Sequence, residues 1–374
     1  MINLFEIYSD EHDVKAVTEV IKRGKSWADG PENKIFEEKI AQYVGRKYAA
    51  VFNSGTSALH SNLLANNIKR GDEVIVPSFT FISTANTVLL AGAKPIFADI
   101  EKKSYGLDPE DVEKKITPKT KAIIPVHYGG APCIEIEKLQ KIAKKYQIQL
   151  IEDAAEGLGS KINNQMVGTH GDSAMFSFCQ NKIITCGEGG AITTDSQETI
   201  DQLHLFRSHG REEKGISYFN STKPLDYIKL GYNYRLPTIC AALGISQLEK
   251  IEDLIKKRQA IAKEFDLRLK ECRQVKTPYK SNHINHIYQM YTIEVPVKER
   301  EKLQQKLLDQ GIMTKIYFPP IHLEKLYKNK YKYSENMLPV TEEISKKVLT
   351  LPMHPKIKLE EIEYISKSII EYFR

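Results

Sequence analysis

The sequence predicts an α/β fold, in which a large domain with a mostly parallel sheet is followed by a smaller α+β domain. From Tyr48 onward short apolar runs alternate with helical stretches, which is typical of parallel strands covered by helices on both faces. The chain has 374 residues, 41% of them hydrophobic, and is therefore long enough to bury more than one core. We expect residues 1–245 to form the large domain and residues 246–374 the small one.

The expected elements can be placed in order along the chain. Residues 1–47 have a polar, helical pattern that is interrupted at Gly30-Pro31. Short apolar runs predict strands of the large sheet at 48–52, 73–77, 94–98, 122–126, 148–152, 174–178 and 191–194. Helical patterns between them fall at 56–66, 81–91 and 136–146. In the C-terminal part we expect one long helix over 238–269, strands at 291–295 and 314–317, and helices at 298–310 and from 359.

Composition argues against several classes of protein. The 54 basic and 48 acidic residues give a net charge of +6 that is spread along the chain, so we expect no nucleic-acid partner. No apolar run approaches 18 residues, and the chain does not start with a signal-peptide pattern, so we expect neither a membrane span nor secretion. The five cysteines form no C-x-x-C pair, which indicates reduced thiols and a cytoplasmic location. We expect no metal site.

One lysine stands out by its position between two predicted strands. Lys182 follows the apolar run 174–178 and precedes the run 191–194, and a Gly-Glu-Gly-Gly turn lies at 187–190. A lysine held between buried strands, beside a turn whose backbone a ligand can approach closely, is a candidate Schiff-base nucleophile. The alternative is an ordinary solvated loop lysine.

Three further segments follow the carboxyl ends of predicted strands, where ligands bind on such sheets. The segment 53–57, Asn-Ser-Gly-Thr-Ser, begins a helix and could hold a phosphate, although an ordinary helix cap would look the same. The segment 78–81, Ser-Phe-Thr-Phe, follows another strand, and an aromatic there could stack on a flat heterocycle, although such an aromatic is more often core.

Asp153 comes directly after the predicted strand 148–152. A carboxylate there could hold the nitrogen of a pyridine ring in its protonated form; a helix cap is the alternative. At about 4 Å and an effective dielectric near 20 the attraction is roughly 4 kcal/mol, or about three pKa units. A phosphate cup, a stacking ring, a carboxylate and a lysine are together the groups that hold pyridoxal phosphate and let it act as an electron sink. We therefore expect this cofactor.

The sequence resembles the DegT/DnrJ/EryC1/StrS family of sugar aminotransferases, which have the fold type I architecture of pyridoxal-phosphate enzymes. The resemblance covers nearly the whole chain. The segments that carry it are Gly30-Pro31 with Phe36-Glu37, Asn53-Ser54-Gly55-Thr56, Pro77-Ser78-Phe79-Thr80-Phe81, Glu152-Asp153-Ala154-Ala155-Glu156, Ser177-Phe178 to Lys182, Gly187-Glu188-Gly189-Gly190, Gly231-Tyr232-Asn233-Tyr234-Arg235 and Leu351-Pro352-Met353-His354-Pro355.

The resemblance implies a role for each matching residue. Lys182 would link covalently to the cofactor and later move protons between cofactor and substrate carbons. Asp153 would pair with the ring nitrogen, Glu156 would lie near the phenolic oxygen, and Phe81 would stack on the ring. The phosphate would be bound by Gly55, Thr56 and Ser177, and by Asn233 from the neighbouring subunit of a homodimer with shared active sites.

Two residues are kept as candidate substrate-side groups. His322 stands where the family often places such a histidine, although a packed surface histidine is the alternative. Trp27 is the only tryptophan, and packing is its default interpretation.

The resemblance also bears on the substrate. Some relatives carry histidine in place of the lysine and are sugar dehydratases; Lys182 therefore favours transamination. The segment around Lys182 is most similar to that of enzymes that aminate C4 of a 4-keto-6-deoxy nucleotide sugar, such as perosamine synthases, with L-glutamate as the amino donor. Cys179-Gln180 departs from that pattern, so 3-keto-sugar and keto-cyclitol aminotransferases remain alternatives. A catalytically idle, cofactor-binding regulatory homologue is another.

Overall fold

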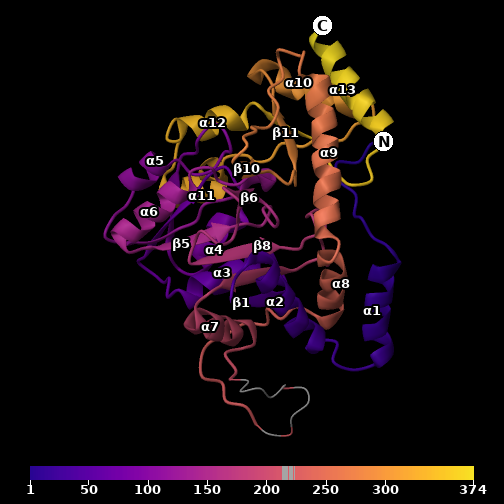
Figure 1. Cartoon of the computed structure of the whole chain (residues 1–374). Helices are drawn as coiled ribbons and strands as arrows, with labels where there is room; N and C mark the ends of the chain where they lie inside the picture. Colours follow the sequence, from indigo (N-terminus) through magenta and orange to yellow (C-terminus); the bar gives the residue numbers. More distant parts are fainter. Residues whose placement is uncertain (213–217, 219–221, 223) are drawn as a thin grey trace.

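A computed structural model of the chain describes residues 1–212, 218, 222 and 224–374. Its centre is a seven-stranded sheet with the strand order β1-β9-β8-β5-β4-β2-β3 (Figure 1). All neighbours are parallel except β9, which runs antiparallel to both β1 and β8. The strands are β1 (Tyr48–Phe52), β2 (Glu73–Pro77), β3 (Lys94–Ala98), β4 (Thr120–Ile123), β5 (Gln149–Asp153), β8 (Ser173–Ser177) and β9 (Gly190–Thr194). The predicted α/β class and mostly parallel sheet are confirmed.

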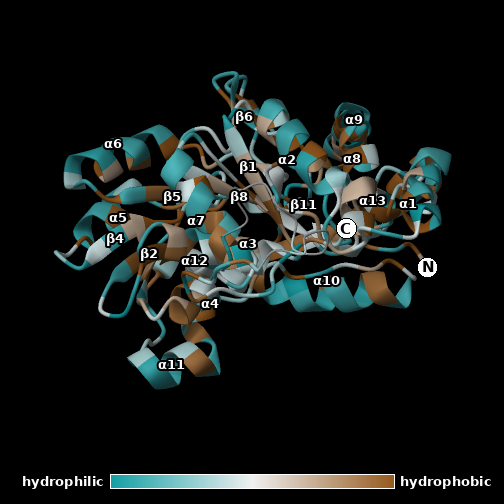
Figure 2. Cartoon of the chain, turned by 90° about the horizontal axis from the view of Figure 1, so that it is seen from below, coloured by the Kyte–Doolittle hydropathy of each residue, from teal (hydrophilic) through white to brown (hydrophobic). Residues whose placement is uncertain are grey.

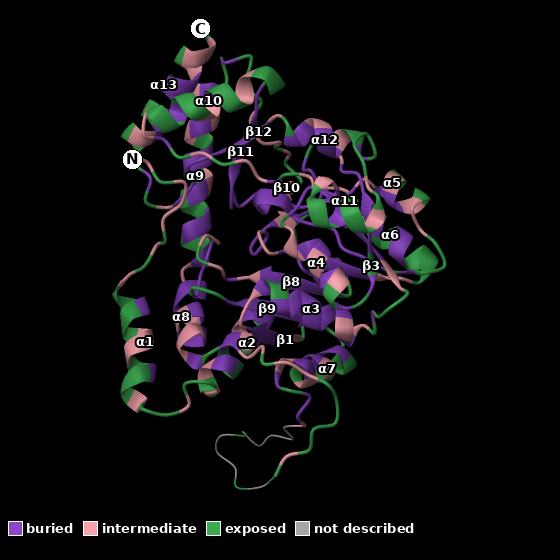
Figure 3. Cartoon of the chain, turned by 180° about the vertical axis from the view of Figure 1, so that it is seen from behind, coloured by how far each residue is buried: buried purple, intermediate pink, exposed green. Residues whose placement is uncertain are grey.

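Helices cover both faces of this sheet because its strands are apolar on both sides. Along β2, Val74 and Val76 pack into one core, whereas Ile75 between them points into another. The first core also receives α3 (Gly55–Ala65), α4 (Ser83–Leu90) and α7 (Gln197–Arg207). The opposite face is covered by α2 (Pro31–Val44), α5 (Pro109–Lys114), α6 (Ile136–Tyr146) and α8 (Thr238–Leu248). Figure 3 shows the strands buried between these layers.

The C-terminal part has its own core around a two-stranded antiparallel sheet. Strand β11 (Tyr291–Glu294) pairs with β12 (Val348–Leu351), and Phe265, Leu303 and Ile365 pack against this pair from three helices. These helices are α9 (Ile251–Leu269), α10 (Val297–Asp309) and α13 (Leu359–Phe373). The outer surface of α10 is largely hydrophilic (Figure 2). Both termini lie at this end of the molecule (Figure 1).

Short elements complete the chain. Helix α1 (Glu11–Arg23) packs on α8. A small sheet joins β6 (Lys161–Ile162) and β7 (Gln165–Met166) to β10 (Ile284–Asn285). The remaining short helices are η1 (Tyr128–Gly130), η3 (Ile321–Leu323), α11 (Lys325–Tyr331) and α12 (Pro339–Ser345).

Three details of the prediction are wrong. The long helix expected over 238–269 is divided into α8 and α9 at Lys250, whose backbone (φ −110°, ψ 8°) is not helical. The amine of Lys250 binds the carboxylates of Asp10 at 2.7 Å and Asp13 at 2.9 Å. Residues 314–317 are not a strand and make a single bridge from Lys315 to Thr350. The strand that pairs with β11 is instead β12, which was not predicted.

The two parts of the chain exchange segments. Three buried residues that come after β11 in the sequence pack into the core of the large domain, beside α3, α4 and α7. They are Ile321, Tyr327 and Leu338. Ile2 at the opposite end of the chain pairs with Ile312 and packs against the C-terminal core. The division into 1–245 and 246–374 stays a prediction, and its boundary falls inside α8.

Candidate active site

The carboxyl ends of β1, β2, β5 and β8 meet at one edge of the large sheet and bring the predicted site residues together. Gly55 follows β1, Phe81 follows β2, Glu156 follows β5, and Ser177 ends β8. Parallel strands place their carboxyl ends on the same edge, which is why residues more than a hundred positions apart converge here. Lys182 lies in the loop between β8 and β9.

Lys182 is held by Glu156. Its Nζ lies 3.2 Å from Oε1 of Glu156, and the side chains of the two residues are 14% and 10% exposed. The other carboxylate oxygen of Glu156 accepts the backbone N–H of Gly129 at 2.8 Å. The lysine amine is thus placed by a carboxylate that is itself fixed to the η1 segment.

Asp153 is the last residue of β5 and is 4% exposed. Its Oδ2 accepts a hydrogen bond of 2.7 Å from Oγ1 of Thr84, and its Oδ1 accepts the N–H of Ala155 at 3.2 Å. Burial raises the pKa of the Asp153 carboxyl above its ordinary value, while the hydrogen bonds from Thr84 and Ala155 and the charge of Lys182 oppose that rise.

A cup of small and hydroxyl side chains surrounds the start of α3. Ser54 caps this helix and accepts the N–H of Ser57 at 3.1 Å. The first N–H groups of a helix have no partner within it and form the positive end of its dipole. Gly55 is tightly packed, since a Cβ there would lie 3.2 Å from both Ser177 Cβ and Met175 Sδ. The exposed Thr56 reaches Ser83 on α4, with 2.8 Å between the hydroxyls.

The predicted stacking and substrate-side residues differ in exposure. The ring of Phe81 is 60% exposed at the mouth of the site, 6.2 Å from the ring of Phe318. Trp27 is 49% exposed, and its indole N–H donates to the carbonyl of Val20. His322, in contrast, has no exposed surface, so the prediction that it faces the substrate directly is not supported.

The ring of His322 lies between two buried partners. Its Nδ1 is 2.7 Å from the hydroxyl of Ser78, and its Nε2 is 3.3 Å from Glu342. Burial lowers the pKa of His322 below the ordinary value, against the opposing effect of Glu342. Because Ser78 directly follows β2, His322 supports the segment that ends in Phe81.

Asn233 lies beside the cup of its own chain. The side-chain amide of Asn53 donates to the carbonyl of Asn233 at 3.4 Å, and the N–H of Asn53 donates to Tyr234 at 2.9 Å. The side chain of Asn233 is exposed. This geometry leaves its amide available to a ligand or to a second subunit.

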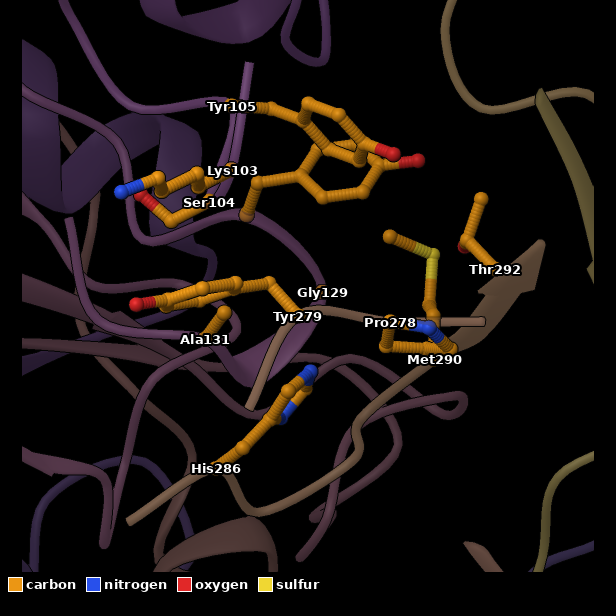
Figure 4. Close-up of a pocket in the computed structure, with 11 residues that line it drawn as sticks. Lys103, Ser104, Tyr105, Gly129, Ala131, Pro278, Tyr279, His286, Met290 and Thr292 are labelled. Atoms are coloured by element: carbon orange, nitrogen blue, oxygen red, sulfur yellow. The ribbon is translucent and has the colours of Figure 1, made fainter. Parts of the chain in front are cut away.

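A hollow behind the site does not contain any of the predicted residues. Tyr105, Tyr279, His286 and Met290 line it, and Figure 4 shows their side chains gathered around it. Gly129 borders both the hollow and the site, because it lines the hollow and its N–H donates to Glu156.

Comparison with known proteins identifies the family of this chain. The sequence model of the DegT/DnrJ/EryC1/StrS aminotransferase family matches residues 8–370. The chain belongs to this family. A GDP-perosamine synthase of Escherichia coli O157:H7 is 37% identical over 351 residues, which cover 93% of this chain and 92% of that protein.

Solved structures of aminotransferases have the same fold. PseC of Helicobacter pylori, an aminotransferase involved in the biosynthesis of pseudaminic acid, superposes with a TM-score of 0.93 at 31% identity and covers 100% of this chain and 99% of its own. The PLP form of Spr1654 from Streptococcus pneumoniae gives a TM-score of 0.92 at 26% identity, with 100% and 99% covered. The protein is a pyridoxal-phosphate-dependent sugar aminotransferase with the fold type I architecture.

The residues present fit the cofactor of this family. The close approach of Gly55 to Ser177 leaves a cradle of backbone N–H and hydroxyl groups that suits a phosphate. Asp153 is a buried carboxylate with no cation bound to either oxygen among the described residues, so it can pair with a protonated ring nitrogen. Lys182 supplies the amine, and exposed Phe81 supplies an aromatic face.

Two supporting groups were not found from the sequence. Thr84, which binds Asp153, is one threonine among several in a helical stretch, and nothing in the pattern marks it. Gln289 donates from Nε2 to the carbonyl of Asn181 at 2.5 Å and so supports the loop that carries Lys182, although Asn181 lies 108 positions earlier in the sequence.

None of the helices in the described ranges is long and apolar enough to cross a membrane. The His, Cys, Asp and Glu side chains of the same ranges include no group that could hold a metal ion.

Proposed function

We propose that the enzyme transfers an amino group from L-glutamate to the keto carbon of a nucleotide-linked sugar, at C4 of a 4-keto-6-deoxyhexose. The GDP-perosamine synthase relative and the pseudaminic-acid enzyme PseC support a nucleotide sugar as acceptor. The choice of C4 rests on the similarity of the segment around Lys182 to C4-aminating enzymes. Cys179 and Gln180, which depart from that segment, keep a 3-keto sugar or a keto-cyclitol as alternative acceptors.

The observation that carries this proposal is the placement of the Lys182 amine on Glu156, at the sheet edge that also holds Asp153 and the cup of Gly55, Thr56 and Ser177. A catalytically idle homologue would have no need to keep this lysine positioned. The intact Lys182, Asp153 and Glu156 therefore favour an active enzyme over a regulatory protein that only binds the cofactor.

Each side chain would have a defined task. Pyridoxal phosphate, when bound, supplies the electron sink that stabilises negative charge at the substrate carbon. Lys182 would hold the cofactor and, once released from it, would take up and deliver the proton at Nζ. Glu156 fixes this amine, Asp153 would hold the proton of the ring nitrogen, and Phe81 would cover the ring.

We further propose that two chains build each site. Asn233 has an exposed side chain at the rim of the cup, beside Asn53. In a symmetric dimer an exposed amide at this position could complete the phosphate site of the partner subunit. Trp27 remains a candidate for contact with the substrate, whereas His322 would act through Ser78.

The first experiment separates the two half-reactions. Purified enzyme loaded with pyridoxal phosphate is mixed with L-glutamate alone, and conversion of the cofactor to its amine form is followed by absorbance. Reoxidation by a panel of 4-keto and 3-keto nucleotide sugars and keto-cyclitols then identifies the acceptor. Failure of glutamate to convert the cofactor, while another amino acid does, would refute the donor; preference for a 3-keto sugar would refute C4.

A further inference from the structure

Thr84 is the only side chain among the described residues that donates a hydrogen bond to Asp153. It lies in the first turn of α4 and is 1% exposed, and the distance from its Oγ1 to Asp153 Oδ2 is 2.7 Å. The other oxygen of the carboxylate accepts only the backbone N–H of Ala155, at the longer distance of 3.2 Å. The hydrogen bond from the Thr84 hydroxyl is therefore the shorter of the two that fix this carboxylate.

The direction of hydrogen bonding beyond Thr84 follows from chemistry. An ionised carboxylate only accepts, so the single hydrogen of the Thr84 hydroxyl must point to Asp153. Thr80, whose Oγ1 lies 3.0 Å from that of Thr84, must then donate to Thr84. The result is an ordered buried chain from Thr80 through Thr84 to Asp153, in which each donor polarises the next.

The groups around Asp153 have opposing effects on its ionisation, so the hydrogen bond from Thr84 influences whether the carboxyl is charged. Burial disfavours the charged form of the Asp153 carboxyl, the positive charge of Lys182 favours that form, and the like charge of Glu156 disfavours it. Glu152, the neighbour of Asp153 on β5, is turned to the opposite face and pairs with His127. The hydroxyl of Thr84 therefore acts together with Lys182 and the N–H of Ala155 against the effects of burial and Glu156.

We propose that Thr84 is a positioning residue that orients the Asp153 carboxylate and supplies the hydrogen bond that keeps it negatively charged. This inference rests on the role proposed above for Asp153 as partner of the cofactor's ring nitrogen. A protonated Asp153 could not hold a protonated ring nitrogen by charge. Thr84 would thus affect the reaction without touching substrate or cofactor.

The test compares two buried threonines of the same helix. Thr84→Val removes the hydroxyl with little change in volume, and Thr84→Ser restores it. Thr87→Val is the matched control, because Thr87 has no exposed surface and its hydroxyl donates to the carbonyl of Thr84, at 3.1 Å, and to no other group of the described residues. We expect Thr84→Val to lower kcat by about tenfold to a hundredfold, the range expected for a lost hydrogen bond to a charged group.

Two readouts separate positioning from a merely structural role. The acid limb of the pH–rate profile should move to higher pH by about one unit in Thr84→Val, since Asp153 would then take up its proton more readily. In apo protein, infrared difference spectra should show the carbonyl stretch of a protonated carboxyl at a higher pH in Thr84→Val than in wild type. Thr84→Ser should return both values, and Thr87→Val should leave kcat within about twofold.

The Asp153→Asn background distinguishes this inference from the proposed function. If Asp153→Asn retains near-normal turnover, the role of Asp153 itself is refuted. If Asp153→Asn is inactive while Thr84→Val keeps the wild-type kcat and pH profile, the present inference alone is overturned. Should Thr84→Val fail to fold, Thr80→Val interrupts the chain one bond earlier; a shift of the acid limb in the same direction supports the inference, and an unchanged limb overturns it.

Discussion

Glu152 is a buried anion whose loss should destabilise the fold. It has no exposed surface, and its carboxylate accepts the N–H groups of Gly168, His170 and Gly171 at 2.7 to 2.8 Å. His127 accepts the N–H of Cys133 at Nδ1, so its Nε2 carries the hydrogen and donates to Glu152 at 3.0 Å. Burial raises the pKa of Glu152, but the hydrogen bond from His127, the electrostatic effect of the His127 and His170 rings and the N–H of Gly171 together hold it at about 2, below the ordinary 4.5.

The size of the effect follows from this difference in pKa. Each pKa unit corresponds to about 1.4 kcal/mol, so the charged form of Glu152 contributes about 3 kcal/mol to the free energy of unfolding. Since the pKa is lower in the folded chain, this contribution is present above pH 4.5 and is lost as the pH falls from 4.5 toward 2. Glu152→Gln should therefore cost about 3 kcal/mol at pH 7.

Urea unfolding of the apo protein, followed by circular dichroism, measures this cost. The difference between wild type and Glu152→Gln should be equal at pH 7 and pH 5 and should shrink below pH 4.5. Glu113→Gln is the control, because Glu113 is 39% exposed and pairs with Lys145 at the surface. Surface ion pairs contribute little to stability, so this change should leave the unfolding midpoint close to that of the wild type. A loss below about 1 kcal/mol for Glu152→Gln at pH 7, or a loss that grows toward acid, would refute the reasoning.

Three further changes test the site. Lys182→Ala should lower turnover by several orders of magnitude. Borohydride treatment of the wild-type enzyme should attach the cofactor to Lys182. Attachment to another lysine would contradict the assignment. Lys182→Ala and Asn233→Ala enzymes should each be nearly inactive. When the two are mixed in equal amounts with verified subunit exchange, about 25% of wild-type activity should return, because half of the dimers carry one intact site of two. No recovery would show that Asn233 does not serve the partner's site. Gln289→Met should lower kcat with little effect on KM, because the carbonyl of Asn181 loses its hydrogen bond. The control Gln259→Met removes an amide that bonds to Asn285 and His286, and it should change kcat little. Equal losses in both variants would assign Gln289 a general structural role.

The large sheet could be predicted because its signal is local. Each strand is a short apolar run, most of the strands alternate with helices, and the residues after β1, β2, β5 and β8 are recognisable from their own chemistry. The rule that parallel strands place their ligands at one edge then brings Gly55, Asp153 and Lys182 together without any knowledge of distances.

What could not be predicted depends on contacts between distant segments. Thr84 and Gln289 have ordinary local surroundings, and only the fold places them on Asp153 and on the Lys182 loop. The break at Lys250 has a similar cause, since the helical pattern continues through it and the carboxylates that bind its amine lie some 240 positions earlier. Strand β12 did leave a signal, an apolar run ended by Pro352, but a four-residue run is ambiguous without its partner strand.

The return of Ile321, Tyr327 and Leu338 to the core under α3, α4 and α7 has a consequence for synthesis of the chain. Domains often fold as units while the ribosome is still elongating the chain. Here the core beneath the cofactor site lacks three buried members until Leu338, about nine tenths of the way along the 374 residues, has been translated. Folding of the catalytic half must therefore be completed late, and a nascent chain stalled before this point would expose an apolar surface for chaperones to cover.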